Sequence, residues 1–573
     1  MRRFERLLVF ACVVGLSQAW AAAPIAPQEK PTPPPAMAMG EHLPATIAEW
    51  GKGARLYAGL GTYHRRVTTR SPKAQRYFDQ GMRFLWTFNH DESTRSFAHA
   101  LALDPTCAMC AWGVALSIGP NYNLPMLAEA RARIAFEATN EAQRLAGSGT
   151  KVEQALIRAL ALRYPNANPL DPSTAIPVLT AYANAMRDVA KRFPADLDVQ
   201  TMFAESMMNI HAWKLWGVDG TPTEGTVEIV TTLEGVIAKS PMHMGALHYY
   251  VHAVEASPNP EKAVVAAERL RGLAPAAGHL EHMPAHILHR VGRYEESAEA
   301  NRKGAAADVA YLGTTTPIDY YPMYFSHNYQ FLAFSTAAEG REAETFDAVK
   351  RSRASLTDEL LEQMPGMDWY VAELYAAYVR FGRWDELLAQ AAPNPNLPGL
   401  TGGYLYATSV ALAAKNRPVE ARDKLVKLQK LLDELPADAP AGAGQNTMRS
   451  VLAIGVRMAT AKIAMAEGRS DDALRELGTA VELEDALVYD EPSEWFFPVR
   501  HVLGAELLRQ GKSAEAERVY RRDLDLHPAN GWALRGLADA QKAQSKTEEA
   551  SATEAKFREA WKYATISITA SAF

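Results

Sequence analysis

Histidine is concentrated in one part of this sequence. Eight of its 15 histidines lie between His243 and His327, where a uniform distribution would place about two. In the stretch MGALHYYVHAVEA, His248, His252 and Glu255 are spaced at i, i+4 and i+7, so on a helix all three share one face. Imidazole and carboxylate groups are the usual nitrogen and oxygen donors to zinc, iron and copper. The spacing therefore predicts a transition-metal site.

A second group of histidines follows in the stretch GHLEHMPAHILHRVGRY. Pro284 is not expected deep inside a helix, so we place it in a first turn. His279 and His282 then lie on the entering loop, and His286 and His289 lie within the helix. Together, the loop and the first turns can direct several ring nitrogens to one point.

The elements that would position these histidines repeat along the chain. In YFDQGMRFLWTFNHDESTRSFAHALALDP, Gly81, Phe97, Ala100 and Pro105 lie at the offsets of a 34-residue helix-turn-helix unit. Small residues allow two helices to cross closely, the aromatic residue fills the space between units, and proline ends the second helix. A clear second copy has the equivalent residues Gly504, Gly511, Ala516, Tyr520 and Pro528.

These residues resemble tetratricopeptide repeats, and the resemblance extends from about residue 70 to 566. It implies an all-α fold, a right-handed solenoid of antiparallel helix pairs whose first helices line a concave groove. His252 and His286 are 34 residues apart, which is one full repeat, and His327 follows 41 residues later. We therefore expect a row of imidazoles in the groove, which His211 extends.

The preferred metal ligands follow from this row. They are His248, His252, His286 and His327, followed by Glu255 and His282, with Glu255 also a candidate general base and copper, iron or zinc the candidate ion. The aromatic residues expected to line the groove are Trp213, Trp216, Tyr249 and Tyr324. An alternative stays open, in which the histidines and nearby tyrosines form a structural hydrogen-bonded network without metal.

Two further cysteines form the motif CAMC at Cys107 and Cys110. Their spacing at a helix start allows either a structural disulfide or a redox pair. Ala111 follows the second cysteine, so the signature for attaching a c-type haem is absent.

The N-terminal residues and the linker-like segments suggest how the chain is divided into domains and where the protein is located. Residues 1–21 have the basic, apolar and small-residue parts of a signal peptide, and residues 22–49 read as a linker rich in proline and alanine. A solenoid carrying the histidines is predicted for 50–433, a linker for 434–447, and further repeats for 448–566. No later apolar run is long enough for a transmembrane segment. We expect a periplasmic or secreted protein.

The composition and the absence of several motifs argue against other classes of protein function. The net charge of −6 gives no basic surplus for binding nucleic acid. The sequence has no GxSxG, phosphate-binding glycine loop or HExxH motif, which disfavours serine hydrolases, nucleotide-driven proteins and common zinc proteases.

A closer resemblance is carried by LDPTCAMCAWG, HYYVHAVEAS, GHLEHMPAHI and the later pair His327-Asn328. These motifs resemble those of exported bacterial tetratricopeptide proteins with a CxxC and a histidine-rich central region. The resemblance implies a shared groove and does not supply a reaction.

Three functions are consistent with the sequence. The first is an interaction scaffold that binds a protein or peptide partner in the concave groove and holds a metal ion there. The second is a metal-dependent enzyme, either an iron or copper oxidoreductase or a zinc hydrolase, with Glu255 or Glu281 as the base. The third is a periplasmic metal carrier that uses Met242, Met244 and Met283.

Overall fold

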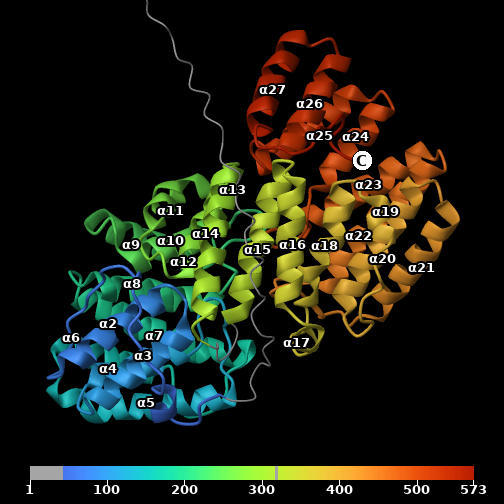
Figure 1. The fold of residues 1–573 in the computed structure, drawn as a ribbon. Helices are drawn as coiled ribbons and strands as arrows, with labels where there is room; N and C mark the ends of the chain where they lie inside the picture. Colours follow the sequence, from blue (N-terminus) through green and yellow to red (C-terminus); the bar gives the residue numbers. More distant parts are fainter. Residues whose placement is uncertain (1–42, 316–320) are drawn as a thin grey trace, which may run out of the picture. The chain divides into compact units, whose positions relative to one another are not determined.

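Consecutive helices pack against one another along the chain in the computed structural model, which describes residues 43–315 and 321–573 (Figure 1). The fold is an all-α solenoid of antiparallel helix pairs, as predicted, and the described residues form one compact unit. The predicted signal peptide and most of the following linker lie outside the described residues.

The helices of the first part of the chain run to the histidine-rich region. They are α1 Ile47–Trp50, α2 Pro72–Trp86, α3 His90–Leu103, α4 Ala108–Ile118, α5 Glu129–Leu145, α6 Lys151–Ala161, α7 Pro172–Arg192, α8 Leu197–Met208, α9 Thr226–Lys239, α10 Met244–Glu255, α11 Val264–Leu270, α12 Gly278–His282, α13 Pro284–Arg290 and α14 Tyr294–Leu312. Short 3-10 turns span Ala146–Ser148, Asn209–His211 and Pro260–Ala263.

The second part continues in the same manner. Its helices are α15 Tyr321–Ala338, α16 Glu342–Ser355, α17 Asp358–Glu362, α18 Asp368–Arg380, α19 Trp384–Leu388, α20 Pro398–Ala414, α21 Pro418–Glu434, α22 Met448–Ala466, α23 Ser470–Asp485, α24 Val499–Arg509, α25 Ser513–Leu526, α26 Gly531–Ala543 and α27 Thr547–Ala560.

A small β-hairpin lies within the segment 434–447, where a linker is predicted. Strand β1, Pro440–Ala441, pairs antiparallel with β2, Asn446–Thr447. Gly442 donates its backbone N–H to the carbonyl oxygen of Gly366 at 3.0 Å, which fastens the hairpin to the segment before α18. The predicted domain boundary at this segment stays a prediction.

Small residues allow the helices of a repeat to pack closely, as the sequence pattern predicts. Phe97 on α3 is fully buried between Gly81 on α2 and Gly113 on α4. A Cβ atom at either glycine would lie 2.6 Å or less from the Phe97 ring, so only glycine allows the helices to approach this closely. Tyr520 is held in the same way between Gly504 and Gly536.

The histidine-bearing helices begin with defined caps and turns. His243 caps α10, since its Nδ1 accepts the backbone N–H of Ala246 at 3.1 Å. Pro284 lies in the first turn of α13, as predicted. His279 and His282, however, lie on the short helix α12 rather than on a loop. Gly278 and Gly304 allow this turn to pack closely on α14, because a Cβ on either one would clash with its neighbours.

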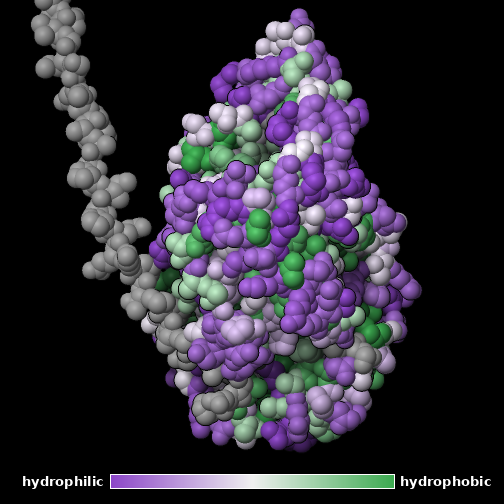
Figure 2. Space-filling view, turned by 90° about the vertical axis from the view of Figure 1, so that its right-hand side faces the viewer, coloured by the Kyte–Doolittle hydropathy of each residue, from purple (hydrophilic) through white to green (hydrophobic). Residues whose placement is uncertain are grey.

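Within 43–315 and 321–573, none of the helices has both the length and the apolar content that a membrane span needs. The face displayed in Figure 2 is mostly hydrophilic, and its hydrophobic residues occur in small groups.

Candidate metal centre

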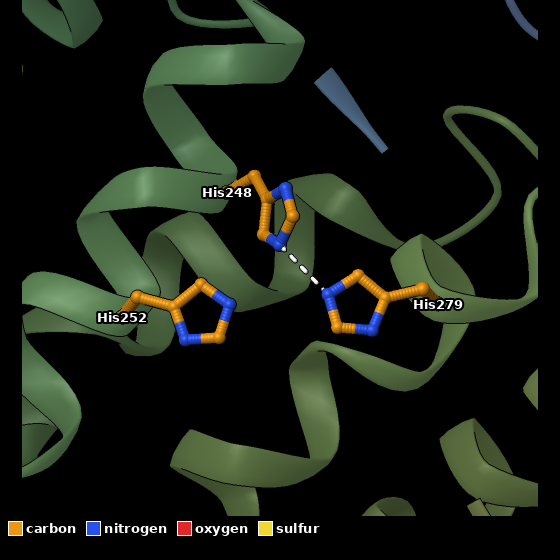
Figure 3. Close-up of side chains that lie close together, drawn as sticks. All are labelled: His248, His252 and His279. Atoms are coloured by element: carbon orange, nitrogen blue, oxygen red, sulfur yellow. Dashed lines mark hydrogen bonds between the residues drawn. The ribbon is translucent and has the colours of Figure 1, made fainter. Parts of the chain in front are cut away.

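Three histidines from α10 and α12 point toward one another (Figure 3). They are His248, His252 and His279, and one ring nitrogen of each lies within 4.8 Å of the others. All three side chains are buried. The two α10 residues meet because they are four positions apart on one helix face, and the packing of the next repeat brings in His279. We call this group the first triad.

Hydrogen bonds fix the orientation of two rings in the first triad. Nδ1 of His248 donates to the carbonyl oxygen of Trp86 at 2.7 Å, and Nδ1 of His252 donates to Oε1 of Glu255 at 2.8 Å. Because these oxygens accept, a neutral ring carries its lone pair on Nε2. Nε2 of His248 lies 3.2 Å from Nε2 of His279, whereas buried Nε2 of His252 has no hydrogen-bond partner.

A second triad lies one repeat further along the chain. His282, His286 and His327, from α12, α13 and α15, again present ring nitrogens within 4.8 Å of one another. Their Nδ1 atoms bond to Asn301 Oδ1 at 2.6 Å, Glu255 Oε2 at 2.6 Å and Gln330 Oε1 at 3.3 Å, respectively. The Nε2 atom of each neutral ring is therefore free to bind an ion.

Two of these nitrogens face each other closely. Nε2 of His282 lies 2.6 Å from Nε2 of His286, and in the neutral tautomers just described both atoms would carry lone pairs. Burial and then the neighbouring His286 keep the pKa of His282 well below its usual range. Burial also lowers the pKa of His286, although Glu255 opposes the shift. A metal ion bound by both nitrogens would offset the repulsion between these lone pairs.

Glu255 connects the two triads. Its carboxylate accepts from Nδ1 of His252 through Oε1 and from Nδ1 of His286 through Oε2, and the Tyr489 hydroxyl donates to Oε2 at 3.2 Å. Burial alone would raise the pKa of Glu255, but the attraction of His286 and the hydrogen bond from His252 outweigh it and lower the pKa well below the usual range. A single ionised carboxylate thus orients one ligand in each triad.

Sequence reasoning missed two members of the cluster. His279 was expected on the entering loop among the histidines that could direct ring nitrogens to one point, but it was not one of the preferred ligands, and Glu491 was not considered. Glu491 forms a third group with His252, Glu255 and His286, and its carboxylate contacts Nδ1 of His286. Burial, and then the charge of Glu255, raise the pKa of Glu491 well above its usual range. No local pattern in the loop after α23 predicts this contact across repeats.

A cavity of about 630 Å³ borders the cluster. His279 of the first triad and His327 of the second both line it, as does Glu491. Its wall also contains Trp213 and Tyr324. Each triad therefore presents one histidine to the same space.

No family model and no curated protein match this chain. Among solved structures, the human IFIT1 dimer with PPP-AAAA is 12% identical, covering 84% of this chain and 94% of that one, with a TM-score of 0.34. The P58(IPK) TPR domain is 12% identical, covering 78% and 99% of the two chains, with a TM-score of 0.23. The described residues of this chain are all-α apart from one short β-hairpin.

The aromatic residues predicted for the groove occupy different places. Trp213 and Tyr324 line the cavity, and the Tyr324 ring centroid lies 4.5 Å from that of His279. Trp216 instead donates its Nε1–H to the carbonyl oxygen of Ala253 at 2.8 Å. Tyr249 is buried against Trp86. His211, expected to extend the row, also lines the cavity.

Cys107 and Cys110 lie away from this cluster in the repeat that holds Phe97. Their sulfur atoms are 2.07 Å apart, across the first turn of α4. Both side chains are fully buried. The choice between a structural disulfide and a redox pair stays a prediction.

Proposed function

We propose that the two triads bind transition-metal ions and that the protein is a metal-dependent enzyme acting on a small molecule in the adjoining cavity. The observation that carries this proposal is that His279 and His327, one from each triad, line a single cavity of about 630 Å³. Three imidazoles on an ion leave a coordination position open for water or substrate, as catalytic sites require.

The hydrogen-bonding pattern of the rings favours metal over a purely structural network. In a structural network every buried ring nitrogen should have a partner, yet Nε2 of His252 and Nδ1 of His279 have none. The rings that are anchored bond through Nδ1 to oxygen acceptors, which is the arrangement found behind metal-bound histidine.

The protonation state of the rings also suits metal binding, because only a neutral imidazole binds an ion. Burial, and then the charge of a neighbouring ring, keep the pKa of His248 and His279 well below the usual range. Burial and His286 lower the pKa of His327 to about 3. Protons therefore do not compete for these nitrogens near neutral pH.

The cavity supports the enzyme over the other two functions left open by the sequence. A scaffold should show ligands that are fully occupied along an open groove, whereas an enzyme needs an open metal position that faces an enclosed space. A carrier should direct methionine sulfur to the ion, yet the side chain of Met242 is 54% exposed to solvent. Partner docking in the groove stays a prediction.

Export to the periplasm is part of the proposal. It is supported by the signal-like residues 1–21 and by a buried cysteine pair at disulfide distance, which persists in oxidising compartments. Sequencing the N-terminus of protein recovered from the periplasm should find it just after residue 21 or 23; an intact Met1 would contradict export.

Elemental analysis of protein made in the periplasm without a histidine tag tests metal binding. We expect bound transition metal, and we expect replacement of His252 and His286 by Asn to remove it without unfolding the C-terminal repeats. His289→Asn is the matched control, because His289 lies on α13 beside His286 but bonds Ser335 and belongs to no triad. Unchanged metal content in the double variant would refute the proposal.

A further inference from the structure

We propose that the two triads form one two-copper centre that binds dioxygen between the ions and oxidises a small aromatic diol, such as a catechol, held in the cavity. This inference rests on the proposed function and adds the number of ions, the oxidant and the substrate class.

The closeness of the triads indicates a single centre. Within the triads, neighbouring ring centroids lie 4.6 Å apart for His282 and His286 and 5.0 Å apart for His248 and His252. Between the triads, the centroids of His252 and His286 are 5.6 Å apart, and those of His279 and His282 are 5.9 Å apart. Rings of different triads are thus hardly farther apart than rings of one triad, so two bound ions would be neighbours.

Glu255 links the first triad and the second triad into one unit. Its two carboxylate oxygens accept from His252 of the first triad and His286 of the second. Moving either ring therefore disturbs the orientation of the other. This coupling is not expected of two independent ion sites.

The ligand type and the closeness of the two triads favour copper. Each triad consists of three imidazoles, with no carboxylate among them. Two divalent ions at this separation would repel each other four times as strongly as two monovalent ions, since the energy scales with the product of the charges. Imidazole is a good ligand for copper, and copper is stable as Cu(I). Two adjacent Cu(I) ions also hold two electrons that dioxygen can accept.

The cavity suits a planar aromatic substrate with polar substituents. Trp213 and Tyr324 provide aromatic surface beside His279. Asn123, Asn209 and Lys214 in the same wall offer polar groups for hydroxyl substituents. In the overall reaction, two catechols each lose two electrons and two protons to become quinones. One dioxygen gains those four electrons and four protons and becomes two waters.

The experiment uses the full mature chain, loaded anaerobically with Cu(I) and then exposed to air. We expect two coppers per chain, an electron paramagnetic resonance signal far below that of two isolated Cu(II) ions, and consumption of one dioxygen for every two catechols oxidised. His327→Gln, which removes a partly buried ligand of the second triad, should lower catechol oxidation at least 100-fold and make the remaining copper fully visible in the resonance spectrum. His289→Gln should change neither the rate of catechol oxidation nor the copper signal in the resonance spectrum.

Some outcomes would overturn this inference and leave the proposed function standing. They are two coppers with full, independent resonance signals, binding of zinc but not copper, or copper binding without catechol-dependent uptake of dioxygen. Failure to bind any of these metals would refute both proposals.

Discussion

At the scale of single residues, Glu255 determines how the candidate centre is oriented. It is 1% exposed and accepts from one histidine in each triad. Since Tyr489 donates to the same carboxylate, Glu255 has little capacity left to take a proton from a substrate. Its geometry supports a positioning role more than the role of general base that the sequence suggested.

Replacing Glu255 by Gln tests that role. A neutral amide can accept from one ring but presents N–H groups to the other, so one imidazole loses its fixed tautomer. We expect metal affinity to fall by about 10- to 100-fold, measured by competition with a chelator. Glu281→Gln is the control, because Glu281 on α12 is also buried but accepts from the Gly272 backbone N–H. Equal effects in the two variants would count against positioning by Glu255.

Many of the residues at the centre were predictable, because helical spacing and the repeat period are local signals. His248 and His252 share a helix face, and His286 and His327 follow at about one repeat each. The division into two triads was not predictable from the sequence. It depends on which ring nitrogen of each histidine forms a hydrogen bond to a neighbouring residue. The role of His279 depends on the packing of α12 against α10, which no local spacing reveals.

At the scale of elements, glycine and aromatic residues set the distance between helices. Phe97 is enclosed by Gly81 and Gly113. The sequence pattern predicted the roles of Gly81 and Phe97, whereas the contact with Gly113 is seen only in the structure. The short helix α12 and the hairpin of β1 and β2 were not predicted. Both are too short to show a periodicity.

Gly113→Ala tests this packing. The new methyl group would lie 2.4 Å from the buried Phe97 ring, so we expect the free energy of unfolding to fall by about 1–3 kcal/mol. Gly235→Ala is the control, because nothing lies within 4 Å of its added Cβ in α9. It should raise the free energy of unfolding by about 0.5–1 kcal/mol. Urea denaturation measures both, and a neutral Gly113 variant would contradict the close fit.

At the scale of the whole molecule, segments that are far apart in the sequence meet at the histidine cluster. Glu491 and Tyr489 follow α23, yet they contact His286 and Glu255 from the central repeats. Residues 443–445 of the hairpin turn line the same cavity as His279. A repeat pattern predicts neighbouring units well, but it carries no information about contacts between units far apart in the chain.

The most direct test of the central claim is anomalous X-ray diffraction from crystals of the full chain loaded with metal. We expect two anomalous peaks, one within about 2.0–2.1 Å of three imidazole nitrogens in each triad. The first should lie among His248, His252 and His279, and the second among His282, His286 and His327. Peaks elsewhere, or none after loading, would contradict the assignment of the histidine cluster as a metal centre.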